Sequence, residues 1–330
     1  MVRDEIICNE LPLTEAFIPT RLLHREGQLR EIERCLKPAL KNKTIDNVFL
    51  VGPTGTGKTS VAKRILETHF KDISSYTNCW KYRSTHEVLK EILLAFEIPV
   101  HGREPTGELT GILEKVARKK RIIVFLDEVD QLKDFGVLYT LTRNGCGVVL
   151  ASIHCHALMN LHSRIKSSLA ITEIELPRYT PDELFDILKD RVEFSFKPRT
   201  LRAELIRLAS VMASGDARSG LQILIRAGRK AEIRGKDHVT IEEIREARKE
   251  AQKFRKSPIL SRLNVDERII YELLEKKRKL PSGQLYLEYR KLVSKPVVDR
   301  AYRNYMTRMV KLGLIKSTGS GRWRDYEIVL

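Results

Sequence analysis

The chain has 330 residues, of which 42% are hydrophobic and 31% are charged, and this length allows two or three domains with separate cores. No apolar run reaches the ~18 residues that cross a bilayer, and the N-terminus lacks the basic and apolar segments of a signal peptide. From these features we expect a cytoplasmic protein without a membrane partner.

The net charge of +17 is unevenly distributed. From residue 255 onward there are 18 Lys and Arg against 8 Asp and Glu, a net charge of +10 over 76 residues, and the preceding residues contribute only +7. This asymmetry predicts a polyanionic partner for the C-terminal part. The alternative is a charge that serves solubility alone.

The five cysteines are scattered and contain no C-x-x-C pair, which indicates reduced thiols. His154, Cys155, His156 and His162 are close together in the sequence. Adjacent side chains point in different directions, however, and no second cluster completes a tetrahedral site. We therefore expect no metal ion at these residues.

The first half of the chain alternates short apolar runs with helical patterns. The expected strands cover residues 45–51, 122–126 and 147–152, and the expected helices cover residues 58–70 and 84–97. This alternation predicts an α/β domain over residues 1–178, in which helices cover both faces of a parallel sheet.

Only helical patterns follow up to residue 255. Thr180 and Glu183 have the spacing of a capping box, and Thr240 and Glu243 repeat it. We expect an all-α domain over residues 179–255, with a charged linker at residues 249–258.

Residues 256–330 combine three helical stretches with a predicted β-hairpin. Gly319 and Gly321 separate two short β-like runs in this hairpin. Helices followed by such a hairpin are typical of a winged-helix domain.

A glycine-rich loop follows the first expected strand. Residues 52–59 match G-x-x-x-x-G-K-[ST] between a strand and a helix, where the motif binds phosphates through backbone N–H groups and the helix N-terminus. Lys58 would reach the β- and γ-phosphates, and the Thr59 hydroxyl would hold Mg²⁺. The predicted nucleotide contacts are Gly52, Pro53, Thr54, Gly55, Thr56, Gly57, Lys58, Thr59 and Ser60.

An acidic pair follows the second expected strand. Asp127 would orient Mg²⁺ through its water shell, and Glu128 is the candidate base that polarises the attacking water. The alternative is a solvated acidic loop, which the glycine-rich loop upstream disfavours. Together the two motifs predict binding of ATP or ADP with Mg²⁺.

Further segments resemble the archaeal origin-recognition initiators, AAA+ proteins related to the largest subunit of the eukaryotic origin recognition complex. The similar segments are residues 24–32, 76–79, 84–97, 161–169 and 215–218. They occur in the family's order, and with the C-terminal domain they extend over nearly the whole chain. The resemblance implies a P-loop AAA+ domain, an all-α lid and a C-terminal winged helix.

The resemblance also implies roles for three arginines. Arg25 lies in the segment that borders the adenine in the family. Arg164 would be an arginine finger directed at the nucleotide of a neighbouring protomer, although Ser163 replaces the proline that relatives often carry there. Arg218 would contact the γ-phosphate from the lid. The alternatives are a surface arginine for Arg164 and a lid salt bridge for Arg218.

One departure from the family concerns hydrolysis. Relatives usually carry Ser-Asn after the fourth strand, and the asparagine helps to position the attacking water. This chain has Ser152 and Ile153, and isoleucine cannot form hydrogen bonds through its side chain. We therefore expect a weak ATPase that rests in the ATP- or ADP-bound form.

Residues 297–312 predict a helix that reads DNA. Val298, Tyr302, Tyr305, Met309 and Leu312 would form its buried stripe. The opposite face would enter the major groove with Arg300, Arg303, Asn304, Thr307 and Arg308. The alternative is a solvated basic face.

The hairpin adds Arg322, Trp323 and Arg324 as predicted contacts with phosphates or the minor groove. Trp323 has the alternative of packing on its own domain. By resemblance, Arg103 in the loop after residues 84–97 would also touch DNA.

The nucleotide motifs and the basic C-terminal part, together with the resemblance, favour a replication initiator that binds origin duplex DNA and uses ATP as a switch. By resemblance its further partners are paralogous initiator protomers and the replicative helicase, and it would associate with the nucleoid. Two alternatives are a DNA-binding regulator of transcription or replication with a structural nucleotide site, which Ile153 slightly favours, and a clamp-loader or transposition ATPase.

Overall fold

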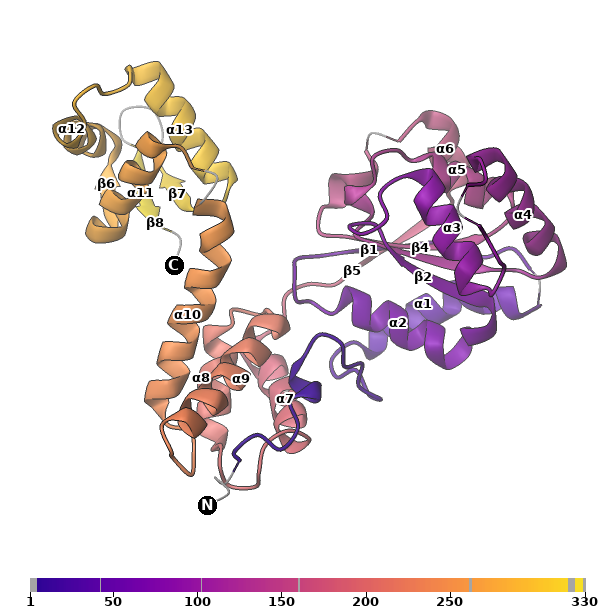
Figure 1. The fold of residues 1–330 in the computed structure, drawn as a ribbon, viewed down its shortest axis with the longest axis horizontal. Coiled ribbons are helices and arrows are strands. Elements are labelled where there is room, and N and C mark those ends of the chain that lie inside the picture. The colour runs from indigo at the N-terminus through magenta and orange to yellow at the C-terminus, as the bar shows by residue number, and fades with distance from the viewer. Residues whose placement is uncertain are drawn as a thin grey trace. The chain divides into compact units, whose positions relative to one another are not determined.

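The computed structural model describes residues 5–41, 43–101, 103–159, 161–260, 263–319 and 324–328, apart from the side chains of residues 163, 164 and 252–259. The chain divides into two compact units, Met1–Arg245 and Glu246–Leu330. Figure 1 labels their elements. Among the described residues no helix has the length and apolar character of a membrane span.

A parallel sheet with the strand order β2-β3-β4-β1-β5 forms the centre of the first unit. Its strands are β1 (Asn47–Val51), β2 (Ser74–Asn78), β3 (Ile123–Asp127), β4 (Gly147–Ser152) and β5 (Ile171–Glu175). The three strands predicted from apolar runs are β1, β3 and β4, which are buried along their whole length because each has a neighbour on both sides. The edge strand β5 was not expected, because most of its residues are exposed or only partly buried.

Helices cover both faces of this sheet, as the sequence predicts (Figure 1). One face packs against α1 (Glu26–Leu36) and α2 (Lys58–His69). The other packs against α3 (Thr85–Ala95), α4 (Thr106–Lys119) and α5 (Gly136–Arg143), and α6 (Ser163–Ser168) follows β4. Short 3-10 turns are η1 (Leu11–Leu13), η2 (Lys37–Lys41), η3 (Lys71–Ile73), η4 (Val129–Gln131) and η5 (Cys155–Leu158).

The rest of the first unit is a helical lid. It contains α7 (Pro181–Glu193), α8 (Ala203–Met212), α9 (Ala217–Ile233) and the start of α10 (Ile241–Leu260). The capping box at α7 is confirmed, because Glu183 N–H donates to the Thr180 hydroxyl at 3.2 Å and Thr180 N–H donates to the Glu183 carboxylate at 2.8 Å. The predicted linker at residues 249–258 is helical and lies within α10.

An N-terminal strap, residues 5–24, runs along the lid (Figure 1). The backbone N–H groups of Ile6 and Ile7 donate to the Glu232 carboxylate at 2.8 and 2.9 Å, and Ile7 forms a β-bridge with Phe196. Further along, the Glu10 carboxylate pairs with the guanidinium of Arg229. The strap therefore contacts the lid near the C-terminal end of α9 and at Phe196, just after α7.

The second unit has the element order helix, strand, helix, helix, strand, strand. These are α11 (Val265–Lys277), β6 (Lys279–Pro281), α12 (Ser282–Leu292), α13 (Asp299–Lys311), β7 (Ile315–Thr318) and β8 (Asp325–Ile328). The predicted hairpin is confirmed by the antiparallel pairing of β7 with β8, and β6 adds a third strand that was not expected. The buried side chains of Tyr271, Tyr289 and Tyr302 lie in the hydrophobic core of this unit.

The buried stripe of α13 differs from the expected one. Tyr302, Met306 and Met309 are almost fully buried, and Tyr305 is only partly buried. Val298 is 71% exposed, because it caps the helix from outside its first turn. The buried residues of α13 begin at Tyr302 and follow at intervals of four and three residues. The prediction that Val298 is buried was therefore wrong.

Candidate functional site

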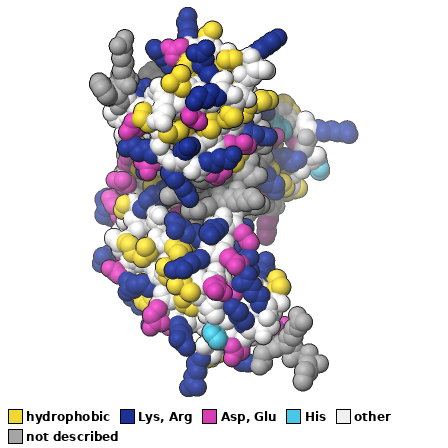
Figure 2. All heavy atoms as spheres, turned by 90° about the vertical axis from the view of Figure 1, so that its left-hand side faces the viewer, with side chains coloured by type: hydrophobic (Ala, Val, Ile, Leu, Met, Phe, Trp, Pro, Cys, Tyr) yellow, Lys and Arg dark blue, Asp and Glu magenta, His cyan; other side chains and the backbone are white. Residues whose placement is uncertain are grey.

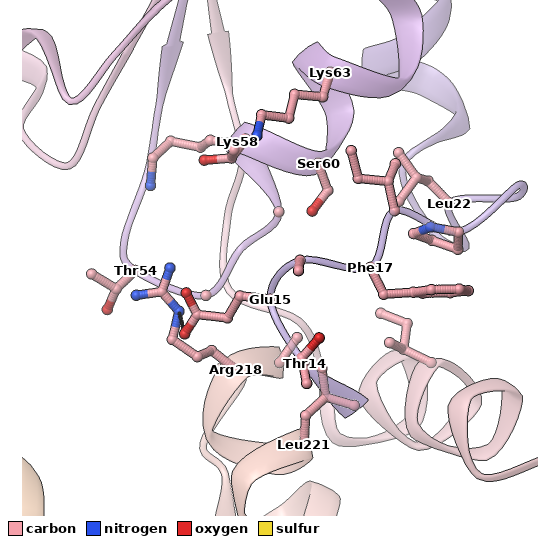
Figure 3. A pocket seen from close by; sticks show the side chains of 18 of the residues that line it. Thr14, Glu15, Phe17, Leu22, Thr54, Lys58, Ser60, Lys63, Arg218 and Leu221 are labelled. Atoms are coloured by element: carbon pink, nitrogen blue, oxygen red, sulfur yellow. Dashed lines mark ion pairs between the residues drawn. The ribbon is translucent and has the colours of Figure 1, made fainter. Parts of the chain in front are cut away.

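Three loops converge where β1, β3 and β4 end. The carboxyl ends of parallel strands share one edge of the sheet, so the loop after β1 meets Asp127 and Glu128 at the end of β3 and Ser152 at the end of β4. They line a cavity of about 220 Å³ together with the strap and the lid. Figure 3 shows strap, loop and lid side chains around it.

The loop between β1 and α2 depends on glycines. Gly57 caps α2 with φ at +92°, and Gly55 has φ at +73°. A Cβ on Gly52 would lie 2.2 Å from the carbonyl oxygen of Leu176. These positions exclude side chains and turn the backbone around the start of α2.

Lys58 and Thr59 at the start of α2 face the acidic pair. The Lys58 ammonium donates to the carbonyl oxygens of Gly52 and Pro53 at 2.7 and 2.8 Å, and burial lowers its pKa while Asp127 opposes that shift. The Thr59 hydroxyl donates to the Asp127 carboxylate at 2.7 Å. The structure thus brings together the two predicted magnesium ligands.

Glu128 has the left-handed conformation, with φ at +55°. Burial and then the charge of Asp127 raise the pKa of its carboxyl, and a hydrogen bond with the Asn78 side chain opposes this rise. Asn78 is held at the end of β2, where its side-chain oxygen accepts a hydrogen bond from Trp80 N–H at 2.9 Å. We did not single out Asn78 from the sequence, because β2 has no apolar run that would align it with β3.

The position after β4 carries no hydrogen-bonding side chain. Ile153 lines the cavity and is 40% exposed, and the Ser152 hydroxyl donates to Asp130 at 2.7 Å. Isoleucine thus occupies the position at which the resemblance led us to expect asparagine.

The start of α9 joins the lid to the phosphate-binding loop. Ala217 N–H donates to the carbonyl oxygen of Gly55 at 3.0 Å, and Asp216 caps the helix by accepting from Ser219 N–H. Arg218 lines the cavity and forms an ion pair with Glu15 of the strap at 2.6 Å (Figure 3).

The strap supplies a wall of the cavity that the sequence did not predict. Phe17 lies under the guanidinium of Arg191, 4.8 Å from the ring centre. Arg191 is only 8% exposed, and its Nε and Nη1 atoms have no hydrogen-bond partner among the described residues. The strap and α7 are far apart in the sequence, so no local pattern could have paired these residues.

The structure describes the side chain of Arg25 but not that of Arg164. Arg25 is buried, donates to the carbonyl oxygens of Thr56 and Pro177 at 3.2 and 2.7 Å, and stacks on the Tyr179 ring. Its contacts hold the phosphate-binding loop and Tyr179 in place, and Arg25 itself is not among the residues that line the cavity. Arg164 belongs to α6, but its side chain lies outside the described part of the structure.

The predicted DNA-binding residues of α13 are exposed in the second unit. Arg303 pairs with Asp299 on the same helix. Arg308 instead donates to the buried carboxylate of Glu267 at 3.1 and 3.0 Å, so it is engaged within its own domain. Arg300, Asn304 and Thr307 complete this face.

The remaining predicted contacts lie in loops. Arg103 is exposed between α3 and α4, and Arg324 is exposed just before β8. Arg322 and Trp323 fall outside the described residues. Figure 2 shows lysine and arginine side chains spread over the visible face, with acidic and hydrophobic side chains between them.

Two domain families match the first unit. Residues 42–179 match an AAA domain, and residues 185–249 match the Cdc6 AAA+ ATPase-type lid domain. These matches agree with the parallel sheet and the helical lid described above.

Similar proteins extend over the whole chain. The ORC1-type DNA replication protein 1 of Sulfurisphaera tokodaii is 31% identical, with 98% of this chain and 88% of that protein covered. The ORC1-type DNA replication protein of Pyrococcus furiosus is also 31% identical, with coverages of 99% and 87%. Among solved structures, the Aeropyrum pernix ORC1 protein in complex with DNA has a TM-score of 0.72 at 30% identity, with coverages of 98% and 94%. By its sequence, its AAA domain and its Cdc6-type lid, this chain belongs to the family of ORC1-type DNA replication proteins.

Proposed function

We propose that this protein binds replication-origin DNA, binds ATP with Mg²⁺, and changes its DNA-bound state with the nucleotide. The observation that carries this proposal is the convergence of the glycine-rich loop, the Asp127–Glu128 pair and the lid residue Arg218 on one cavity. The relative from Aeropyrum pernix that is described in complex with DNA supports the DNA-binding part.

The residues of the cavity fit a nucleoside triphosphate. Glycines that tolerate no side chain leave room for phosphates beside the N-terminus of α2 and the ammonium of Lys58. Phe17 and Arg191 line the same cavity and would border the base or ribose. Mg²⁺ held near Thr59 and Asp127 would neutralise charge on the β- and γ-phosphates.

Hydrolysis by this site is proposed to be slow. Glu128 would polarise the attacking water, and Asn78 holds its carboxylate. Ile153 offers no second hydrogen bond to that water. Arg164 would act on the nucleotide of a paralogous protomer, so hydrolysis would also depend on assembly.

The second unit is proposed to be a winged helix that binds the duplex. Its element order and the β7–β8 hairpin support this reading, with Arg300, Arg303, Asn304 and Thr307 toward the major groove. Arg324 and Arg103 would add backbone contacts. Arg308 is bound to Glu267, so we assign it a structural role.

Two roles follow from family membership and are part of the proposal. The protein would act with paralogous initiator protomers, and it would help to recruit the replicative helicase to the origin. Both roles would be carried out in the cytoplasm, at the nucleoid.

Fluorescence anisotropy with origin duplex and with promoter duplex tests the DNA-binding part. We expect tighter binding to origin DNA, a loss of at least tenfold in the Arg300→Ala/Arg303→Ala variant, and complete loss when residues 261–330 are removed. The control Arg30→Ala/Lys41→Ala removes the same charge from exposed positions of the first unit and should bind normally. Undiminished duplex affinity after the truncation would overturn the proposal.

The two alternative functions give different results. A regulator with a structural nucleotide site, which Ile153 favours, would prefer promoter DNA and bind it equally well in the Lys58→Ala variant. A clamp-loader or transposition ATPase would use its C-terminal unit for oligomerisation, so the truncation would change its oligomeric state while Arg300 and Arg303 would be dispensable.

A further inference from the structure

We propose that Glu15 makes the nucleotide site discriminate between a triphosphate and a diphosphate by competing with the γ-phosphate for Arg218. The inference rests on the proposed nucleotide binding and adds a specificity residue to that site. Its starting point is the ion pair between the Glu15 carboxylate and Arg218 Nε, 2.6 Å long, on the wall of the cavity.

The position of the pair is favourable for competition. Glu15 and Arg218 face each other on the lid side of the cavity, with Thr54 of the phosphate-binding loop beside them (Figure 3). Their side chains are 55% and 49% exposed, so neither is locked in a core. An anionic ligand that entered the cavity could therefore exchange with the carboxylate.

The strap is attached to the lid on both sides of Glu15, and these attachments hold Glu15 close to Arg218. On one side of it, Glu10 pairs with Arg229 of α9, and on the other His24 lies 2.9 Å from Asp186 of α7. The ends of the strap are thus fixed to the helices that frame Arg218. The local concentration of the Glu15 carboxylate around this guanidinium is consequently high.

Lys58, a second cation of the phosphate region, is held differently. Lys58 donates to the carbonyl oxygens of Gly52 and Pro53, which belong to the loop that would cradle the phosphates. A carbonyl carries no net charge, whereas Glu15 does. Glu15 therefore opposes binding of a further anion near Arg218 more strongly than these carbonyls oppose binding near Lys58.

The two nucleotides differ in whether they engage Arg218. A γ-phosphate would have to displace Glu15 and would then lie near the released carboxylate. A diphosphate ends before this point and leaves the ion pair intact. Glu15 should therefore weaken triphosphate binding selectively, and triphosphate binding should release the middle of the strap.

Nucleotide titrations of the full chain with Mg²⁺ test this inference. We compare ADP with a non-hydrolysable ATP analogue in the wild type, in Glu15→Gln and in the matched control Glu10→Gln, which breaks a strap–lid ion pair outside the cavity lining. Glu15→Gln should tighten the ATP analogue about three- to tenfold and change ADP affinity less than about twofold, and Glu10→Gln should not change the ratio of the two affinities. In an Arg218→Gln background, Glu15→Gln should no longer change the ratio.

Other results would overturn the inference. An equal shift for both nucleotides in Glu15→Gln, or the same change of ratio in Glu10→Gln, would mean that Glu15 only fastens the strap. If the wild type bound neither nucleotide, the proposed function would fail together with the inference. If the wild type binds nucleotide but Glu15→Gln leaves the ratio of ATP-analogue to ADP affinity unchanged, the inference is wrong. The proposed function would still stand.

Discussion

Gly55 is the residue at which the phosphate-binding loop touches the lid. Its φ of +73° disfavours any side chain, and a Cβ there would lie 2.0 Å from the Asp216 carboxylate. Asp216 is buried and caps α9, so it has little room to move. The contact ties the conformation of the loop to the position of α9.

Gly55→Ala should therefore weaken nucleotide binding more than tenfold and lower the unfolding free energy of the first unit by about 1–3 kcal/mol. Isothermal titration and thermal unfolding measure the two effects. Gly111→Ala is the control, because a Cβ at this position of α4 meets nothing within 4 Å. It should stabilise α4 by up to about 1 kcal/mol. Normal ADP affinity in Gly55→Ala would contradict the argument.

Asn78 controls the proton affinity of Glu128. Burial and the charge of Asp127 raise the pKa of the Glu128 carboxyl, and the hydrogen bond from Asn78 lowers it. Asn78→Ala should raise this pKa further. A general base works only when deprotonated, so the acidic limb of the pH profile for ATP hydrolysis should move to higher pH.

Single-turnover hydrolysis rates between about pH 5 and 9 measure this shift. Asn144→Ala removes an amide at the end of α5, where it bonds to Thr140, and should leave the profile unchanged. A profile of unchanged midpoint and lower amplitude in Asn78→Ala would show that Asn78 acts on the water or the nucleotide instead.

At the level of single residues, the sequence located the motif residues and left their partners unspecified. Lys58, Thr59, Asp127 and Glu128 are found by spacing because the phosphate-binding loop is a local structure. Asn78, Glu15 and Arg191 act through contacts between distant segments, which no local pattern encodes.

Among the elements, α13 carries arginines with different partners. Arg308 is half exposed and binds Glu267, a residue of α11 whose side chain has no exposed surface. Arg300, in the first turn of the helix, is exposed and has no such buried partner among the described residues. The two arginines should therefore have separable roles.

Arg308→Ala should destabilise the second unit by about 1–3 kcal/mol, because it leaves the Glu267 carboxylate buried without this partner. Hydrogen exchange at amides of α11 and α13 in the full chain should accelerate. Arg300→Ala should leave exchange unchanged and weaken duplex binding. Equal exchange in both variants would show that Glu267 finds another partner.

The junction between α9 and α10 depends on one buried carboxylate. Burial alone would raise the pKa of Glu243, but hydrogen bonds from Thr240, Lys236 and Arg234 outweigh it and lower the pKa to about 2. Because the folded pKa is depressed, this carboxylate contributes stability above the ordinary value near 4.5, and the contribution is lost as the pH falls toward 2.

We therefore expect the thermal midpoint of the first unit to fall between about pH 4.5 and pH 2, and to fall less in Glu243→Gln, which is already destabilised at neutral pH. Calorimetry across this range measures both. Glu242→Gln, one residue away and largely exposed, serves as the control. A parallel pH dependence in wild type and Glu243→Gln would contradict the assignment.

The elements that the sequence predicted are those with a local signature. Buried strands β1, β3 and β4 form continuous apolar runs, and the Thr-x-x-Glu spacing marks the starts of α7 and α10. The edge strand β5 alternates between exposed and buried residues, and β6 has only three residues, so neither forms a recognisable run. Their places are set by pairing with distant strands.

For the whole molecule, the charge is concentrated in one of the two compact units. The +10 from residue 255 onward lies in the unit that carries α13 and the hairpin. Duplex affinity should therefore fall steeply with salt, and Arg300→Ala/Arg303→Ala should reduce the slope of log K against log salt by about two. Anisotropy titrations at several salt concentrations measure the slope. An unchanged slope would mean that these arginines do not contact phosphates.

The strap has a mechanical consequence for the lid. The lid is joined to the sheet by the chain between β5 and α7, and a second crossing runs where the strap leaves the lid at His24 and enters α1. A body attached at two separate points swings about the line between them and is hindered from sliding or twisting away. The lid should thus rotate about a hinge axis through the two crossings. The part of the lid farthest from this axis should move the most.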